Sequence, residues 1–278
     1  MPLPDMIARS TVRLECTGPH GVSVGSSFYH ELVVRPGRNA PILITNRHVV
    51  EGYQQINLHL TASRDDNGRQ TINPRNLHFP DLPSITYFHS NPAIDLAVIL
   101  LGPILNLGVN DGSLINLSGV AEDVFVTPQL EEQLTFLENV IVVGYPQGLW
   151  DTQNNLPLFR RGITASPCMM DYEQEPNFLI DCAIYPGSSG SPVFLYNHPT
   201  YVANNQIQFG TQLAFLGVVA RTIVFNAAGQ PVEQAVPTAV DGAVVSRIPS
   251  SLGIVVKARE VRQLLAESRL HIERNFPY

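Results

Sequence analysis

Short apolar segments of strand length, separated by turn residues, recur along almost the whole chain. The sequence of 278 residues contains 20 glycines and 22 prolines without a fixed period, and most of them fall between these segments. The segments form two series, at residues 7–16, 21–35, 42–50, 54–60, 84–89 and 96–101, and at residues 139–145, 158–169, 177–184, 192–196, 211–225 and 251–257. Many short strands with turn signals between them are typical of a β-sandwich or β-barrel, so the sequence predicts an all-β fold.

Residues 102–138, between the two series, are poor in strand signals and end in a glutamate-rich patch. We interpret them as the connection between two halves and place the boundary near residue 125. After the last strand, apolar positions recur at the spacing of an amphipathic helix. These positions are Ala258, Val261, Leu264, Leu265 and Leu270. The parts expected are an N-terminal half at 1–125, a C-terminal half at 126–256, and a helix with its tail at 257–278.

The charge of the chain limits its partners. The formal net charge is −7 at pH 7, and an acidic chain argues against general binding to nucleic acid or to anionic membranes, which favour a basic surface. The sequence has no apolar stretch of bilayer length, and its first residues show neither a secretory apolar run nor a cleavage site. We therefore expect a cytoplasmic protein.

Three cysteines, Cys16, Cys168 and Cys182, are an odd and sparse set that is unlike a disulfide scaffold. One interpretation is that they are small buried apolar residues in a reducing compartment. The other is a Cys168–Cys182 bridge, since both residues are expected on neighbouring strands. The sequence has no paired His/Cys ligand spacing, so we expect neither a metal nor another cofactor.

The strongest chemical signal lies in residues 181–194, which read Asp-Cys-Ala-Ile-Tyr-Pro-Gly-Ser-Ser-Gly-Ser-Pro-Val-Phe. An acyl-transfer nucleophile needs a hydroxyl on a tight turn, with backbone N–H groups directed at the developing oxyanion. Gly187 and Gly190 on either side of Ser189 permit such a backbone. The alternative is an ordinary Gly/Ser turn between strands.

Two further segments supply the partners that such a serine needs. His48 stands at the end of an apolar strand, and the unperturbed pKa of a histidine, about 6.5, suits a general base. Asp95 opens the apolar run at 96–101, where its carboxylate can accept the imidazole N–H and fix the tautomer. Taken alone, His48 could be an ordinary histidine and Asp95 an ordinary turn residue. Their order places His48 and Asp95 in the first half and Ser189 in the second, so the site is expected in the cleft between the halves.

These segments resemble those of trypsin-like serine proteases. The run Thr-Asn-Arg-His-Val-Val at 45–50 is similar to their histidine segment, Asp-Leu-Ala-Val at 95–98 to their aspartate segment, and Pro-Gly-Ser-Ser-Gly-Ser-Pro-Val at 186–193 to their serine segment. The likeness is greatest to the bacterial HtrA-like and glutamyl-endopeptidase-like branch. Segments 25–28, 143–148 and 161–165 match that branch, and the resemblance covers residues 8–256.

The resemblance implies a chymotrypsin-like fold of two antiparallel β-barrels, here followed by a C-terminal α-helix. It implies a catalytic triad of His48, Asp95 and Ser189, with an oxyanion hole formed by the N–H groups of Gly187 and Ser189. Two departures matter. Ser188 stands where digestive members have an aspartate, and no Ile-Val-Gly-Gly start is present, so we do not expect activation by N-terminal cleavage. We also expect no PDZ domain after the protease.

The resemblance places the base of the primary specificity pocket at Ala183 and Ile184, with a wall at Ala220, Arg221 and Thr222. Without an acidic residue at the base, we expect small or aliphatic residues before the scissile bond. Arg221 leaves an alternative open, because an inward guanidinium would favour acidic side chains.

Protein or peptide substrates are the expected partners, while the oligomeric state is left open. Two alternatives to a self-sufficient protease are a latent protease effector that needs an activating partner and a non-catalytic trypsin-fold module that binds peptides. An esterase of the α/β-hydrolase kind does not fit, since its triad follows a different order along the chain.

Overall fold

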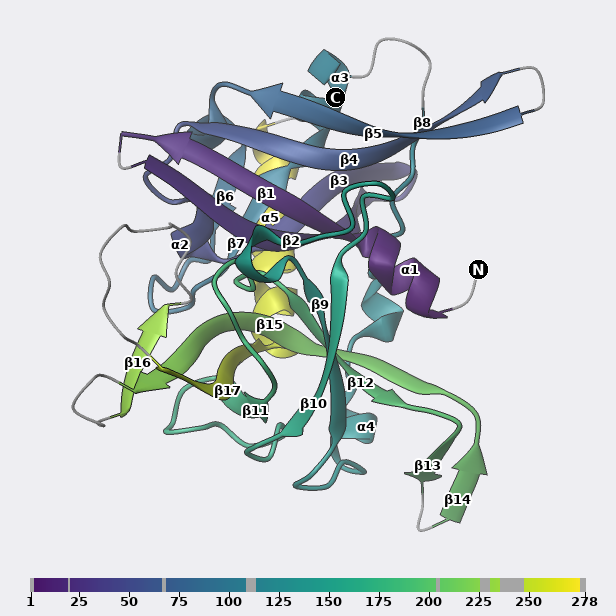
Figure 1. Cartoon of the computed structure of the whole chain (residues 1–278), viewed down its shortest axis with the longest axis vertical. Coiled ribbons are helices and arrows are strands. Elements are labelled where there is room, and N and C mark those ends of the chain that lie inside the picture. The colour runs from purple at the N-terminus through teal and green to yellow at the C-terminus, as the bar shows by residue number, and fades with distance from the viewer. Residues whose placement is uncertain are drawn as a thin grey trace.

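The computed structural model describes residues 3–19, 21–66, 69–108, 114–203, 206–225, 231–235 and 248–275. Two large antiparallel sheets follow one another along the chain, one above the other in Figure 1. The first sheet has the strand order β5-β4-β1-β2-β3-β7-β6, and β8 pairs with β4. Its strands are β1 (Thr11–Gly18), β2 (Gly21–Arg35), β3 (Arg38–Thr45), β4 (Gln55–Asp66), β5 (Arg69–Phe79), β6 (Thr86–Phe88), β7 (Ala97–Leu100) and β8 (Leu114–Ile115).

The second sheet has the order β12-β9-β10-β11-β17-β15-β16, and an additional pairing of β12 with β15 closes six of these strands into a barrel. Its strands are β9 (Asn139–Gly144), β10 (Leu158–Thr164), β11 (Asn177–Asp181), β12 (Pro192–Asn197), β15 (Gln212–Phe225), β16 (Pro231–Ala235) and β17 (Ile248–Lys257). A separate hairpin of β13 (Thr200–Ala203) and β14 (Gln206–Phe209) projects from the end of this barrel (Figure 1).

The helices are few, and most are short. They are α1 (Leu3–Ser10), α2 (Arg47–Val50), α3 (Leu101–Gly108), α4 (Pro128–Glu131) and α5 (Ala258–Asn275), with 3₁₀ turns at Leu82–Ile85, Glu122–Val124 and Pro146–Gly148. Among the residues described, no helix combines the length and the apolar character needed to cross a membrane. The C-terminal helix α5 packs against strands of both sheets and is the yellow ribbon behind them in Figure 1.

The predicted all-β fold with a C-terminal helix is confirmed, and the fold is chymotrypsin-like. Of the two expected barrels, the second is closed by hydrogen bonds. The first is a sheet whose end strands, β5 and β6, do not pair in the described part of the chain. The expected boundary at residue 125 falls between β8 and β9, and the proposed division into domains stays a prediction.

Several segments differ from the sequence expectation. The strand predicted from residue 7 begins at Thr11, because a helix precedes it that buries Ile7 and ends where Ser10 Oγ donates to the Ile7 carbonyl at 2.8 Å. Strand β5 was not predicted, since its polar sequence lacks apolar alternation, yet it pairs along its whole length with β4. In α5, Leu270 is exposed, and Ile272 is buried instead.

The cysteine question is also answered. Cys16, Cys168 and Cys182 are all buried free thiols, so the bridge considered for the last two is not formed. Burial raises the pKa of the Cys168 thiol to about 11. Each cysteine therefore serves as a small apolar core residue, as the first interpretation expected.

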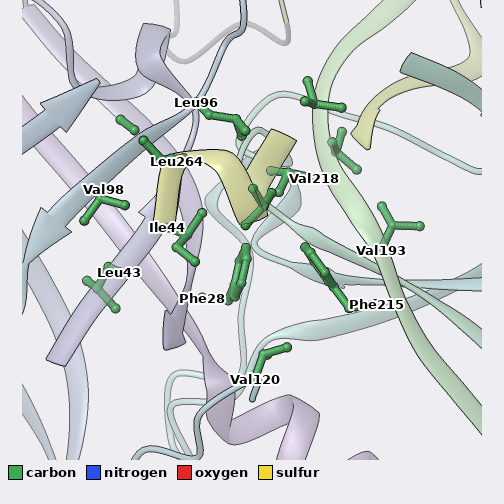
Figure 2. Packing of buried hydrophobic residues seen from close by; sticks show 14 of the residues in the cluster. Phe28, Leu43, Ile44, Leu96, Val98, Val120, Val193, Phe215, Val218 and Leu264 are labelled. Atoms are coloured by element: carbon green, nitrogen blue, oxygen red, sulfur yellow. The ribbon is translucent and has the colours of Figure 1, made fainter. Parts of the chain in front are cut away.

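Aromatic rings join the two sheets into one core. Phe28 of β2 lies 5.1 Å, centroid to centroid, from Phe215 of β15. Phe125 and Phe194 lie 4.6 Å and 5.7 Å from the same Phe215 ring. Figure 2 shows Phe28 and Phe215 facing each other, with Leu264 of α5 close by. This shared core fixes how the two halves meet and hence how their contributions to a site are aligned.

Replacing Phe215 by alanine is expected to lower the free energy of unfolding by about 3–5 kcal/mol, because a fully buried ring at the centre of this cluster is lost. Urea unfolding followed by fluorescence or circular dichroism measures the change. Phe209→Ala is the matched control, since Phe209 is 89% exposed and its loss should change the free energy by no more than about 0.5 kcal/mol. Equal effects of the two substitutions would contradict the shared core.

Candidate active site

His48 lies in a short helix that directly follows a strand. Strand β3 ends at Thr45, and the single turn α2 follows at once. The buried Asn46 amide donates to the Asp95 carbonyl oxygen at 2.7 Å, and the His48 backbone N–H donates to Asp95 Oδ1 at 3.0 Å. These two hydrogen bonds fix α2 to the loop that precedes β7. They thereby set the distance between the side chains of His48 and Asp95.

The three residues expected from the sequence are brought together in one hydrogen-bonded chain. His48 Nδ1 lies 2.6 Å from Asp95 Oδ2, and His48 Nε2 lies 2.9 Å from Ser189 Oγ. A carboxylate only accepts, so Nδ1 carries the proton and Nε2 of the neutral ring is left to accept from the serine hydroxyl. The side chains of His48 and Asp95 are 22% and 24% exposed, whereas Ser189 is buried. The arrangement is that of a general base aligned with a hydroxyl nucleophile.

Ser189 follows a tight turn that directs backbone N–H groups. The Ser188 N–H donates to the Tyr185 carbonyl at 3.0 Å, Pro186 is the second residue of this turn, and Gly187 has a φ of 84°. Proline followed by a residue with positive φ is the signature of a type II turn. The Ser188 N–H is therefore engaged within the turn and is not directed at an oxyanion.

The peptide between Pro186 and Gly187 has a fixed orientation. The Pro186 carbonyl accepts a hydrogen bond from the Gln147 N–H, in the turn after β9. Because C=O and N–H point in opposite directions across a trans peptide, the Gly187 N–H points away from Gln147. No residue in the described part of the chain accepts a hydrogen bond from the Gly187 N–H. This N–H is consequently available to a developing oxyanion.

Ser26, on β2, ties the nucleophile turn to the first sheet. Its Oγ donates to the Gly187 carbonyl at 2.9 Å and accepts from the Tyr145 N–H at 3.0 Å. Its backbone N–H donates to the Ser189 carbonyl at 2.7 Å. Sequence reasoning included Ser26 only within a matching segment and did not identify this role. The sequence of β2 also contains Ser23 and Ser27, so it gives no signal that separates Ser26 from them.

Replacing Gly190 by alanine is expected to lower activity by at least 100-fold and the free energy of unfolding by about 2 kcal/mol or more. Gly190 has a φ of 83°, and an added methyl group would overlap the Ser26 carbonyl oxygen. Gly37→Ala is the matched control, because Gly37 has a similar φ of 79° with no atom within 4 Å of the added carbon. It should cost about 1 kcal/mol and leave activity unchanged. Peptide hydrolysis and urea unfolding measure both, and indistinguishable activities would contradict this packing.

The residues expected to form a specificity pocket converge on one region of the second barrel. Ile184 is buried, and its Cγ1 lies 2.7 Å from where a Cβ on Gly253 would stand. Gly253 pairs with Thr222 across β17 and β15, and Thr222 Oγ1 donates to the Leu252 carbonyl at 3.0 Å. Ala220 is fully buried. The segments at 183–184 and 220–222 are therefore neighbours in space.

Two arginines lie near this region and differ in their contacts. Arg221 pairs with Glu175, with Nη2 and Oε2 2.8 Å apart, so the alternative of an inward guanidinium at this position is not observed. Arg160 of β10, which sequence reasoning did not single out, donates from Nη1 to the Ala183 carbonyl at 2.7 Å and to Ser188 Oγ at 2.8 Å. Within the described ranges, no group of three or more His, Cys, Asp or Glu side chains is arranged to hold a metal ion.

A Ser–His–Asp chain between two antiparallel β-sheets defines the class of chymotrypsin-fold peptidases. A family model described as a trypsin-like peptidase domain matches residues 25–198, so the chain belongs to the trypsin-like peptidase family. The match contains all three residues of the hydrogen-bonded chain.

Similar solved structures come from several proteases. The HtrA-type protease AlgW with a tripeptide is 18% identical, with a TM-score of 0.49, covering 96% of this chain and 61% of that one. The Rv3671c protease from M. tuberculosis in its active form is 19% identical, with a TM-score of 0.45, covering 95% and 83%. A scabies mite inactivated protease paralogue is 13% identical, with a TM-score of 0.46, covering 95% and 96%.

The chain spans about three fifths of the length of the AlgW structure. No curated protein matches it.

Proposed function

We propose that the chain is a serine endopeptidase that hydrolyses peptide bonds through an acyl-enzyme on Ser189. The observation that carries this proposal is the continuous contact from Asp95 Oδ2 through the His48 ring to Ser189 Oγ, with steps of 2.6 Å and 2.9 Å. Membership of the trypsin-like peptidase family supports hydrolysis of peptides in general. The role of each side chain follows from its donors and acceptors.

In the first half of the reaction, His48 Nε2 takes the proton of Ser189 while Oγ attacks the carbonyl carbon of the substrate. The new C–O bond leaves negative charge on the carbonyl oxygen, which the N–H groups of Gly187 and Ser189 stabilise. Asp95 holds the imidazole in its tautomer and stabilises the imidazolium that forms. His48 then gives the proton to the leaving amine, and the C–N bond breaks.

In the second half, water replaces the amine. His48 takes a proton from this water as its oxygen attacks the acyl carbon, and the same N–H groups receive the oxyanion. The proton returns to Ser189 Oγ when the ester C–O bond breaks, so the product acid leaves and the free serine is restored. All proton transfers use Nε2, the one ring nitrogen that faces Ser189.

The residue before the scissile bond is proposed to be small or aliphatic. Ala183, Ile184 and Ala220 bring no charge to the expected pocket, and Arg221 is engaged by Glu175. Digestion of a peptide library, with cleavage sites read by mass spectrometry, tests this preference. A strong signature for Lys or Arg, or for Asp or Glu, before the cleaved bond would contradict it.

The same digestion tests the function itself. We expect cleavage of library peptides by the purified chain, with activity abolished by pretreatment with a fluorophosphonate and unaffected by a metal chelator. Weak cleavage that rises with an added protein partner would support a latent protease effector instead. No cleavage under any condition, with peptide binding retained, would favour the non-catalytic module.

A further inference from the structure

Arg160 lies on the inner face of β10. Along this strand Phe159, Arg161 and Ile163 alternate as exposed or outward positions, while Gly162 and Thr164 share the side of Arg160. The strand pairs with β9, and Arg160 stands opposite Val142 of that strand. The guanidinium is therefore directed toward the segment that carries Ser189, from the interior side of the barrel.

One guanidinium nitrogen joins two points of that segment. Arg160 Nη1 donates to the Ala183 carbonyl at 2.7 Å, where the segment begins, and to Ser188 Oγ at 2.8 Å, next to the nucleophile. Ser188 Oγ also accepts from the Tyr185 N–H at 3.3 Å. Because a hydroxyl oxygen has two lone pairs, these donors account for its accepting capacity. The Arg160 guanidinium therefore holds the turn at 185–188 by hydrogen bonds from the interior side of the barrel.

Stability alone does not account for this cation. Arg160 Nε and Nη2 are buried without a hydrogen-bond partner, and no carboxylate in the described part of the chain pairs with the guanidinium. Desolvation lowers the pKa of Arg160, although an arginine stays protonated in proteins. A buried charge without a counter-ion destabilises the folded state. An apolar side chain of similar length would fill the same space at a lower cost.

We propose that Arg160 is a positioning residue for the oxyanion hole. Its two hydrogen bonds hold the turn at 185–188 in the form that directs the Gly187 and Ser189 N–H groups at the carbonyl oxygen of the substrate. The proposal rests on the serine endopeptidase function proposed above. It adds the pair of hydrogen bonds that keeps the oxyanion hole formed. Ser188 is a second positioning residue, because its hydroxyl oxygen accepts a hydrogen bond from Arg160.

The test compares the wild type with Arg160→Met on a peptide that the wild type cleaves. We expect kcat to fall by about 100-fold, the effect of misplacing one oxyanion donor, while KM changes by no more than about threefold. The rate of phosphonylation of Ser189 by a fluorophosphonate should fall in parallel, because its phosphoryl oxygen occupies the same hole. The midpoint of urea unfolding should stay the same or rise, since an unpaired buried charge is removed.

Arg161→Met is the matched control, because Arg161 is the exposed neighbour whose Nη2 contacts only Asn139 Oδ1 among the residues described. It should leave kcat and the phosphonylation rate unchanged. Ser188→Ala removes the acceptor with a minimal change of shape and should also lower kcat. In the double variant Arg160→Met/Ser188→Ala, the loss should not exceed that of Arg160→Met alone, because both substitutions break one interaction.

The proposal is overturned if Arg160→Met keeps the wild-type kcat, or if it changes the cleavage specificity while kcat on the best peptide is retained. It is also overturned if the loss of kcat is matched by an equal loss of unfolding stability, as for a merely structural residue. If Arg160→Met does not fold, Ser188→Ala takes its place in the test. A wild-type kcat in Ser188→Ala would then contradict the proposal. If the wild type neither cleaves the peptide nor reacts with the fluorophosphonate, the result contradicts the proposed serine endopeptidase function itself.

Discussion

Replacing Ser189 by alanine is expected to lower kcat/KM for peptide hydrolysis by about four to six orders of magnitude. The substitution removes the only hydroxyl within hydrogen-bonding distance of His48 Nε2 in the described part of the chain. The fold should be retained, because Ser189 contributes its backbone carbonyl, not its side chain, to the contact with Ser26. Progress curves at high enzyme concentration, together with circular dichroism, measure both quantities.

Ser191→Ala is the control for this substitution. Ser191 lies two residues further along the chain, is equally buried, and its Oγ has no hydrogen-bond partner among the residues described. Its contacts with Ser188 and Val219 use backbone atoms that alanine keeps. Activity should therefore stay at the wild-type level. Wild-type turnover in Ser189→Ala would remove Ser189 from the role of nucleophile.

Replacing Asp95 by asparagine is expected to lower kcat by about four orders of magnitude with little change in KM. Asp95 accepts two N–H groups, the His48 backbone N–H at Oδ1 and the ring Nδ1–H at Oδ2. An amide offers one oxygen and one NH₂ group, so it cannot satisfy both. With the NH₂ group facing Nδ1, the ring proton moves to Nε2, and Nε2 can no longer accept the proton of Ser189.

Steady-state kinetics of Asp95→Asn and of Asp81→Asn test this role. Asp81 is an exposed loop residue, so its substitution matches the change of charge without touching the site. We expect wild-type kinetics from Asp81→Asn. A loss of less than tenfold in Asp95→Asn would show that the orientation of His48 does not depend on this carboxylate.

The three reactive side chains could be found from the sequence because each stands at a break in an apolar pattern. His48 follows a buried strand, Asp95 opens one, and Ser189 lies between glycines, so local composition and chain order were sufficient. The structure brings these residues together through tertiary contacts: hydrogen bonds join α2 to the loop before β7, and His48 Nε2 lies 2.9 Å from Ser189 Oγ, 141 positions further along the chain. The C-terminal helix was found in the same way from its periodicity, but the order of the strands in the sheets was not predicted.

The supporting residues could not be found in this way. Ser26 and Arg160 act through contacts with residues 161 and 28 positions away along the chain, and neither belongs to a local pattern that indicates such a contact. Arg160 in particular sits in a strand next to Arg161, and only the direction of its side chain distinguishes it from an exposed neighbour. Strand β5 was missed for a related reason, since pairing with β4, not its own polar sequence, makes it a strand.

The direction of Arg221 shows the same limit. From the sequence, an inward guanidinium was an open alternative that would have changed the expected specificity. Its pairing with Glu175, 46 residues away, decides the direction. Tertiary ion pairs of this kind depend on how loops meet over a barrel, which one strand's periodicity does not encode.

Mass spectrometry of the chain after reaction with a fluorophosphonate tests the central claim most directly, because the reagent modifies only a hydroxyl that a general base activates. We predict a single adduct on the peptide that contains Ser189, at a rate that Asp95→Asn lowers strongly and Ser191→Ala leaves unchanged. No adduct on the folded wild-type chain, or an adduct that persists in Ser189→Ala, would contradict it.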